Sequence, residues 1–252
     1  MGMKIAVLIK HTVDVRKVRI NPETGEPALE GKPGLDRADM HAISDAVDLR
    51  ESGEGEVMVV GFGPAAMKDD LVTALATGAD EAIHVLQDRE SDSLATARAL
   101  ADALRDGEFD VIVAGKLAED YGSGQVGMQV AELLDIPHLS GVLSAEQDGD
   151  QLKINYELDG FPDEISLPTP ILLVQTAREG EPKRHSSLRG MMAAKRKTVA
   201  EQEATADSAT SLQWTAPMAA RRGGDRIVLR DEEPAEAAKK LADWLKEHRL
   251  VG

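Results

Sequence analysis

Short aliphatic runs that suit β-strands alternate along this chain with amphipathic stretches of helical periodicity, and Gly or Pro marks most of the boundaries. The run Lys4–Lys10 is apolar on both faces, as a strand in the middle of a parallel sheet is. Strand-like runs recur at Glu56–Gly61, Ala82–Leu86 and Phe109–Ala114, each preceded by a helical pattern or a breaker. This alternation predicts an α/β fold with a mostly parallel sheet.

Helical periodicity fills the intervals between these runs, and the residues that follow are typical helix ends. The predicted helices cover residues 39–49, 64–78, 93–104 and 125–134. A turn at Asn21–Gly25 indicates a hairpin or long loop after the first strand. From Val142 to Val174 the pattern becomes alternating strands with turns at Asp148–Asp150 and Asp159–Gly160. These strands are expected to be antiparallel, with Ile171–Val174 closing the set.

Three parts are expected along the chain. They are an α/β nucleotide-binding domain with its antiparallel extension (1–180), a basic segment (181–200), and a linker with a C-terminal arm (201–252). The basic segment holds six Lys or Arg residues and no acid from Pro182 to its end. Glu201–Thr210 is polar and indicates a linker, and residues 234–248 form an amphipathic helical pattern. A helix on such a linker is expected to dock on another surface.

Composition excludes several functions. The chain has 252 residues and 29 Lys and Arg against 45 Asp and Glu, which gives a net charge of −16. Such a surface repels nucleic acid and anionic membranes unless positive charge is concentrated locally. The absence of cysteine excludes disulfides and thiolate chemistry and is typical of a cytoplasmic protein. The apolar run Met3–Ile9 is too short for a secretory signal or a membrane span.

Two glycine-containing loops follow predicted strands. Gly61–Ala66 matches a relaxed dinucleotide fingerprint, although a plain strand-to-helix turn explains it as well. Gly115–Gly127 opens a helix, and its backbone N–H groups are suited to cradle a phosphate beside Lys116. It is not a Walker loop, because Leu117 follows the lysine where Ser or Thr would hold magnesium. In a parallel sheet both loops lie at the carboxyl edge of the strands, which predicts a nucleotide site there.

No catalytic or metal-binding set is visible. Histidines are scattered without the helical spacing of metal ligands, and adjacent acids such as Glu119–Asp120 are more often solvated than paired for catalysis. The six histidines are His11, His41, His84, His138, His185 and His248. We therefore predict neither a catalytic residue nor a metal site.

Taken in order along the chain, several short segments resemble the β subunit of electron transfer flavoprotein. Their order and spacing carry the resemblance, which covers nearly the whole chain. The segments are Val7–Lys10, Asp39–Ala46, Gly63–Pro64, Thr73–Asp80, Gly115–Lys116, Gln125–Gly127, Asp159–Gly160, Leu167–Pro170 and Arg189–Lys197.

The resemblance implies an adenine nucleotide α-hydrolase-like sheet in a chain that pairs with a larger α subunit. In that family the heterodimer carries a redox-active FAD held mainly by the α subunit, and the β chain holds AMP or, in electron-bifurcating members, a second FAD. Electrons come from acyl-CoA-type or other flavin dehydrogenases and pass to a quinone reductase or similar acceptor. An adenine-nucleotide-binding regulatory module of the universal stress type is the alternative from another class.

Carried over by position, the family's nucleotide site implies a set of residues at the strand ends and in the long glycine loop. They are Leu8, Lys10, Asp36, Asp39, Phe62, Gly63, Thr96, Gly115, Lys116, Asp120, Gly122, Ser123, Gly124, Gln125 and Val126. The basic segment is similar to the family's recognition loop for dehydrogenases, which implies a role for Leu188, Arg189 and Met191, with Leu188 as the apolar anchor. The chain departs from the family at Asp36–Asp39, where many members have Asn-Pro-aromatic-Asp, and at Tyr121, where bifurcating members usually have glycine.

Overall fold

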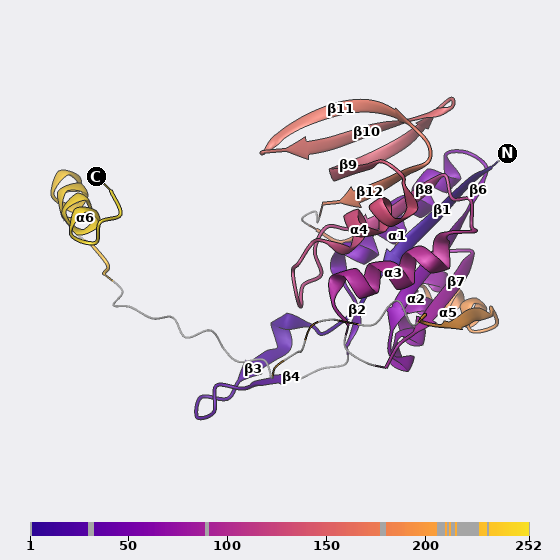
Figure 1. Ribbon diagram of the computed structural model, residues 1–252, viewed down its shortest axis with the longest axis horizontal. Helices are drawn as coiled ribbons and strands as arrows, with labels where there is room; N and C mark the ends of the chain where they lie inside the picture. Colours follow the sequence, from indigo (N-terminus) through magenta and orange to yellow (C-terminus); the bar gives the residue numbers. More distant parts are fainter. Residues whose placement is uncertain are drawn as a thin grey trace. The chain divides into compact units, whose positions relative to one another are not determined.

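The computed structural model describes two compact units that are considered separately, Met1–Pro217 and Met218–Gly252. The described residues are 2–29, 33–88, 91–176, 180–205, 210, 212, 215, 227–230 and 232–251. The first unit carries the sheet and the predicted nucleotide edge (Figure 1). In the second, the described structure is one helix, α6 (Pro234–Glu247), with no buried residue.

A nine-stranded sheet forms the centre of the first unit, in the order β11-β10-β9-β12-β8-β1-β6-β7-β13. Its strands are β1 (Met3–Ile9), β6 (Gly55–Gly63), β7 (Glu81–Leu86), β8 (Val111–Gly115), β9 (His138–Asp148), β10 (Gln151–Leu158), β11 (Phe161–Pro168), β12 (Ile171–Gln175) and β13 (Val199–Glu203). β10 and β11 are antiparallel, and the neighbouring pairs from β9 to β13 are parallel. The α/β prediction with an antiparallel extension is confirmed.

Helices cover both faces of the sheet and bury two hydrophobic cores. On one face α1 (Arg37–Glu51) and α2 (Lys68–Thr77) pack over side chains of β1 such as Ile5 and Val7, joined by Ala194 of α5 (Leu188–Ala194). On the other face α3 (Ser93–Leu104) and α4 (Val126–Leu134) pack over Ala6 and Leu8 of the same strand. The alternation of β1 side chains between two apolar cores explains why that strand is apolar throughout.

The segment between β1 and α1 leaves the sheet and returns to it. Two short ladders form there, β2 (His11–Thr12) with β5 (Gly34–Leu35), and β3 (Val18–Ile20) with β4 (Pro27–Leu29). A 3₁₀ turn, η1 (Val15–Lys17), precedes β3, and a second, η2 (Ala65–Met67), precedes α2. The hairpin predicted at Asn21–Gly25 is therefore present as the β3–β4 turn, in which Gly25 has a φ of 73°.

The prediction that Ile171–Val174 is antiparallel was wrong. These residues form β12, which runs parallel to β8 on one side and to β9 on the other. All five residues of β12 are buried, as expected for a parallel strand covered on both faces. Antiparallel pairing is limited to β9–β10 and β10–β11, because β10 turns back from the end of β9 and β11 turns back again (Figure 1).

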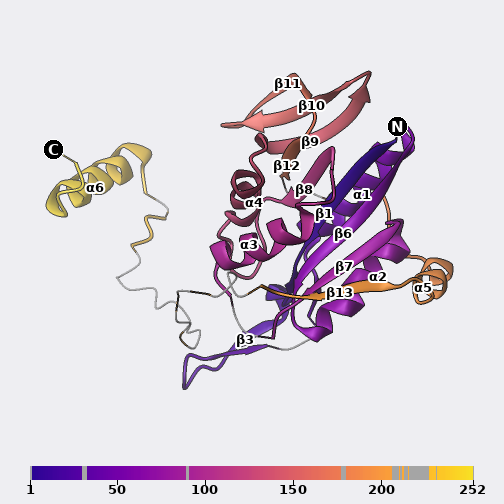
Figure 2. The ribbon, with the colours of Figure 1, turned by 45° about the vertical axis from the view of Figure 1, so that its right-hand side comes forward.

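The boundary predicted between the basic segment and the linker also differs from the structure. Glu201–Glu203, expected in the linker, belong to β13, which pairs parallel with β7 and forms one edge of the sheet (Figure 2). Four of the five β13 residues are exposed and three are polar, so the strand is held by backbone pairing at an edge rather than by an apolar face. The basic segment contains helix α5, packed beside α2.

Candidate nucleotide-binding site

The order of the parallel strands reverses beside β1. From β1 the chain adds β6 and β7 on one side, then crosses to place β8 and β12 on the other. The carboxyl ends of β1 and β8 flank this switch point, which is where open α/β sheets bind ligands. Lys10 follows β1, while Gly115 ends β8 and Lys116 follows it, so the topology brings these predicted residues to one place.

Lys10 connects three elements at this edge. Its backbone N–H donates to Asp39 Oδ2 of α1 at 2.7 Å, and its ammonium donates to Asp120 Oδ1 in the loop after β8 at 2.6 Å. The ammonium also lies 4.4 Å from the centre of the Tyr121 ring, within the range of a cation–π contact. Leu8, two residues earlier in β1, is buried in the core under α3 and α4. The side chain of Leu8 therefore belongs to the hydrophobic core and not to the open edge of the sheet.

Asp36 is the N-cap of α1 and holds the long glycine loop in place. Its Oδ1 accepts the N–H of Ala38, and its Oδ2 accepts the N–H of Glu119, both at 2.8 Å. Both carboxylate oxygens therefore bind backbone groups of the protein. The family resemblance implied that Asp36 contacts the nucleotide. In the structure its two oxygens bind backbone N–H groups, and the bond to Glu119 holds the loop that carries other predicted contacts.

Asp39 is a buried carboxyl among other acids. Burial raises the pKa of Asp39 well above its usual range, and the negative charge of Asp36 raises it further, while the N–H and charge of Lys10 lower it without cancelling the rise. A Cβ on Gly115 would lie 2.8 Å from Asp39 Oδ1. Glycine is therefore required at the end of β8 for α1 to approach that strand.

The loop from Gly115 to α4 has the properties expected of an anion cradle. Gly122 and Gly124 have φ values of 60° and 63°, a left-handed conformation that favours glycine. Lys116 donates its backbone N–H to the Gln175 carbonyl and has an exposed side chain. Ser123 is exposed beside the two glycines.

The helix N-termini at this edge differ in how they are capped. At α3, Asp92 Oδ1 accepts the Ala95 N–H at 2.8 Å, and the carboxylate is buried. At α4 the N-cap is Gln125, which makes no capping hydrogen bond because its Oε1 accepts the Ser93 hydroxyl instead. The N-terminus of α4 keeps its N–H groups and positive dipole end available to an anion, whereas a carboxylate already occupies that of α3. Thr96 lies in the first turn of α3 and Val126 begins α4.

Gly127 explains how α4 reaches this position. A Cβ at this residue would lie 2.9 Å from the Cβ of Ala114 in β8 and 3.5 Å from Val174 in β12. The helix begins close against two strands because glycine occupies this residue, as the last glycine of a dinucleotide fingerprint does. This contact, together with the uncapped N-terminus, favours the long loop as the phosphate-binding one.

The earlier loop, Gly61–Ala66, is better described as a structural turn. Gly61 lies directly under Met67, whose Cε would be 2.3 Å from a Cβ on the glycine. After Gly63 the chain forms η2, and α2 begins only at Lys68, so no α-helix starts at the fingerprint glycines. Phe62 packs against the core under α3 and α4. Phe62 and Gly63 nevertheless end β6 beside β1 at the predicted edge.

Basic side chains near both ends of the segment 181–200 bind other parts of the first unit. Arg184 donates to Asp48 at 2.7 Å and to both Glu51 oxygens at 3.1 and 2.6 Å, which lowers the pKa of the Glu51 carboxyl. Lys183 lies 3.3 Å from Asp48. At the other end, Lys197 donates to the carbonyls of Ala79 and Asp80 after α2, at 2.9 and 3.0 Å. Three of the six basic side chains thus serve attachment.

Helix α5 presents a small exposed face between these attachments. Gly190 lets α5 approach α2, since a Cβ there would lie 2.5 Å from the Ala76 carbonyl oxygen. Leu188 is 81% exposed and Met192, one turn later, is 61% exposed. Met191, which the sequence suggested for recognition, is partly buried. The spacing of Leu188 and Met192, four residues apart on one helix, is the signal that would have identified Met192.

Charge surrounds that apolar pair. Among the described residues, Arg189, Lys195 and Arg196 are the basic residues of the segment whose side chains form neither an ion pair nor a hydrogen bond, and all three are exposed. An exposed apolar pair with a cationic rim on a chain of net charge −16 suits an acidic partner surface.

Comparison with known proteins identifies the family. The sequence model of the electron transfer flavoprotein domain matches residues 29–207. An electron transfer flavoprotein subunit beta of Syntrophomonas wolfei is 35% identical over 250 residues, covering 98% of this chain and 97% of the relative. The subunit beta of Bacillus subtilis is 32% identical over 264 residues, covering 99% and 100%. That of Homo sapiens is 31% identical over 204 residues, covering 78% and 80%.

This chain belongs to the electron transfer flavoprotein family. Its matches are β subunits along nearly its whole length, so the resemblance found in the sequence is confirmed. Membership implies association with a flavin and a role in electron transport. The comparisons do not favour the regulatory module as an alternative.

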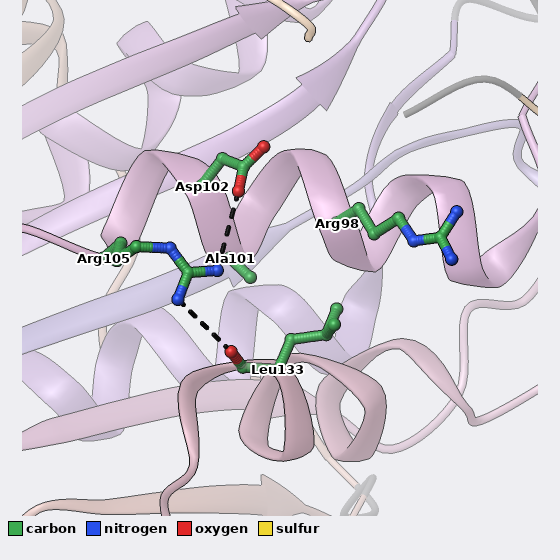
Figure 3. A pocket seen from close by; sticks show the side chains of 5 residues that line it. All are labelled: Arg98, Ala101, Asp102, Arg105 and Leu133. Atoms are coloured by element: carbon green, nitrogen blue, oxygen red, sulfur yellow. Dashed lines mark hydrogen bonds and ion pairs between the residues drawn. The ribbon is translucent and has the colours of Figure 1, made fainter. Parts of the chain in front are cut away.

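A surface hollow of about 360 Å³ lies apart from the predicted site of this flavoprotein chain. It is lined by Arg98, Ala101, Asp102, Arg105 and Leu133 of α3, α4 and the residue after α3 (Figure 3). Arg105 bridges it, 3.7 Å from Asp102 and 3.5 Å from the Leu133 carbonyl. The hollow contains none of the predicted nucleotide residues. The switch point, where loops and a free helix N-terminus converge, remains the better candidate despite the size of this hollow.

Among the described residues there is neither a metal-binding cluster nor a membrane-spanning helix. No group of three or more His, Asp or Glu side chains within the described ranges is arranged to hold a metal ion. None of the described helices is both long and apolar enough to cross a membrane.

We expect the pKa of Asp39 to lie above that of an exposed aspartate, because burial raises it. A carboxyl with a raised folded pKa stabilises the fold at pH values below its unfolded pKa of about 4, and this contribution is lost as the pH rises through the folded pKa. An infrared pH titration should show a protonated-carboxyl band of the wild type that is lost at a higher pH than the bands of exposed aspartates, and this band should be missing in Asp39→Asn. The exposed variant Asp135→Asn is the control, and an unchanged band in Asp39→Asn would contradict the assignment.

Proposed function

We propose that this chain is the β subunit of a heterodimeric electron carrier. It pairs with an α subunit that holds most of the redox-active FAD, accepts electrons from flavin dehydrogenases, including those of the acyl-CoA type, and passes them to a quinone reductase or similar acceptor. The match to β subunits over 98% of the chain supports this proposal most directly. The flavin supplies the electron chemistry, so the protein contributes binding, orientation and electrostatics. The cytoplasmic location expected from the cysteine-free composition stays a prediction.

We infer that the switch point holds AMP. The free N-terminus of α4, the left-handed glycines Gly122 and Gly124, and the exposed Lys116 fit one phosphate. The other candidate anchor, the N-terminus of α3, is capped by the buried carboxylate of Asp92. One anion-binding helix end suits a mononucleotide better than the pyrophosphate of a second FAD.

Counting nucleotides tests this inference. Denaturing the purified heterodimer should release about one FAD and one AMP per pair of chains. Lys116→Met should weaken AMP binding about tenfold, because a charge-assisted contact to phosphate is lost, whereas Lys68→Met on α2 should not. Two FAD per heterodimer would instead support electron bifurcation, and the absence of any second nucleotide would contradict a nucleotide site in this chain.

We further propose that the exposed face of α5 docks on dehydrogenases. Leu188 and Met192 supply the apolar contact, and Arg189, Lys195 and Arg196 supply the charge. An apolar anchor surrounded by charge is the usual arrangement of a small transient interface. The three basic residues bound to α1 and α2 hold the helix and are not expected to touch the partner.

The two kinds of residue on this face should have different kinetic effects. Leu188→Ala should lower the second-order rate of electron transfer from a dehydrogenase at least about tenfold, because the complex loses an apolar side chain that is buried only on docking. Neutralising Arg189, Lys195 and Arg196 together to Gln should slow association and flatten its dependence on salt. Flavin content should be unchanged in both variants. Transfer rates equal to the wild type for Leu188→Ala would exclude the docking role.

The C-terminal helix α6 is proposed to dock on the α subunit. None of its residues is buried, Leu241 is 53% exposed, and Trp244 stacks on His248 with ring centres 4.2 Å apart. An amphipathic helix of 14 residues that buries nothing within its own unit gains stability by covering its apolar face elsewhere.

Replacing an apolar residue of α6 should therefore weaken the heterodimer. Leu241→Asp is expected to raise the dissociation constant at least about tenfold, measured by analytical ultracentrifugation of the two chains. Lys239→Gln, an exposed substitution in the same helix that also changes the net charge by −1, is the matched control. Equal effects of the two substitutions would exclude an apolar docking face.

A further inference from the structure

His84 is a buried titratable side chain for which neither sequence nor family suggested a role. It lies in β7 with no exposed surface. Strand alternation places it on the same face as Ala82, which belongs to the core under α1 and α2. Gly61 of β6 lies opposite it on one side, and Glu201 of β13 lies opposite it on the other. The imidazole therefore sits between a strand that ends at the predicted nucleotide edge and the strand that follows α5.

One ring nitrogen is fixed by its partner. His84 Nε2 lies 3.0 Å from the Gly63 carbonyl oxygen. A carbonyl oxygen only accepts hydrogen bonds, so Nε2 carries the proton and donates it. The same carbonyl accepts the Gln87 N–H at 3.0 Å. Two donors thus fix the carbonyl of Gly63, the residue at which β6 ends.

The other nitrogen has a different environment. Nδ1 is buried and has no hydrogen-bond partner in the described part of the chain. The carboxylate of Glu201 approaches it to 3.8 Å. Buried polar atoms without a partner are rare and usually have a functional or structural reason. Here the ring orientation that leaves Nδ1 unbonded is the one that brings Nε2 to Gly63.

We propose that His84 is a positioning residue for the nucleotide bound at the switch point. Its Nε2–H holds the Gly63 carbonyl, and this sets the direction in which the Phe62–Gly63 turn presents its backbone to an adenine nucleotide. The role rests on the proposed function, since it requires a nucleotide in this chain. His84 itself is behind the strand end and acts through Gly63, not by touching the ligand.

Two isosteric amides separate this role from packing. Glutamine places its side-chain N–H where His84 has Nε2, whereas asparagine places it where His84 has Nδ1. In the heterodimer, His84→Asn should weaken AMP binding about tenfold, the effect of losing one buried hydrogen bond, and His84→Gln should stay within about threefold of the wild type. Flavin content and circular dichroism should be unchanged. Equal loss in both variants would attribute the effect to packing, and no loss in either would overturn the role of the hydrogen bond.

A measurement on the wild-type ring does not depend on whether a variant folds. Nitrogen-15 spectra of the histidine-labelled heterodimer, with the His84 signal assigned from its absence in His84→Gln, should show a protonated Nε2 that shifts when AMP is removed. An unprotonated Nε2 would overturn the proposal. A wild-type heterodimer without AMP or other nucleotide in this chain would refute the proposed nucleotide site, and a retained nucleotide with wild-type affinity in His84→Asn would refute only the role of His84.

Discussion

The first turn of α1 determines the geometry of the nucleotide edge. Asp36 binds the backbone of the glycine loop at Glu119, and Asp39 binds the backbone of β1 at Lys10. Glycine at residue 115 allows the same turn to lie against the end of β8. Two carboxylates thus hold the helix to both sides of the switch point. The cost is a buried acid, and the raised pKa of Asp39 shows how the site accommodates it, by favouring the neutral form.

The same helix also sets the position of the basic segment. The chain that leaves β12 is bound to α1 in succession by contacts of Asp45 with Gln175, of Arg37 with the Gly180 carbonyl, and of Asp48 with Arg184. A polar segment without an apolar core of its own requires such contacts to keep one conformation. Helix α1 therefore links the nucleotide edge and the base of the docking face through one rigid element.

Local sequence signals predicted the parts of the fold that depend on local chemistry. The apolar run of β1 was sufficient to predict a central strand of the sheet, and the glycines before α4 were sufficient to predict a loop with left-handed residues at that place. The direction of β12 was predicted wrongly, because an apolar run does not indicate which strands it will pair with. The burial of all five residues in the structure is typical of a parallel strand covered on both faces. Strand β13 gave no signal, because a polar edge strand is defined by its partner β7.

The residues of the candidate site also divide into those that local sequence could suggest and those that depend on contacts between distant parts of the chain. Gly115 and Lys116 were predicted at this edge because strand ends in a parallel sheet converge, and Lys10 was implied by the family resemblance; the structure brings the three to one place. The role of Asp36 was not, because it depends on Glu119, 83 residues away, and neither residue alone suggests the contact. His84 was one of six scattered histidines until the pairing of β6, β7 and β13 placed it beside Gly63.

Net charge alone would misjudge the basic segment. Six cations in a chain of net charge −16 suggest a single electrostatic surface, but Lys183, Arg184 and Lys197 are used to fasten the segment to acids of α1 and carbonyls after α2. These attachments reduce the number of free charges, so the remaining three cations lie in or just after helix α5, which also carries the exposed Leu188 and Met192 and packs closely on α2 at Gly190. If this face docks on dehydrogenases as proposed, long-range attraction guides encounter and the apolar pair provides the contact, an arrangement that favours fast association and fast release.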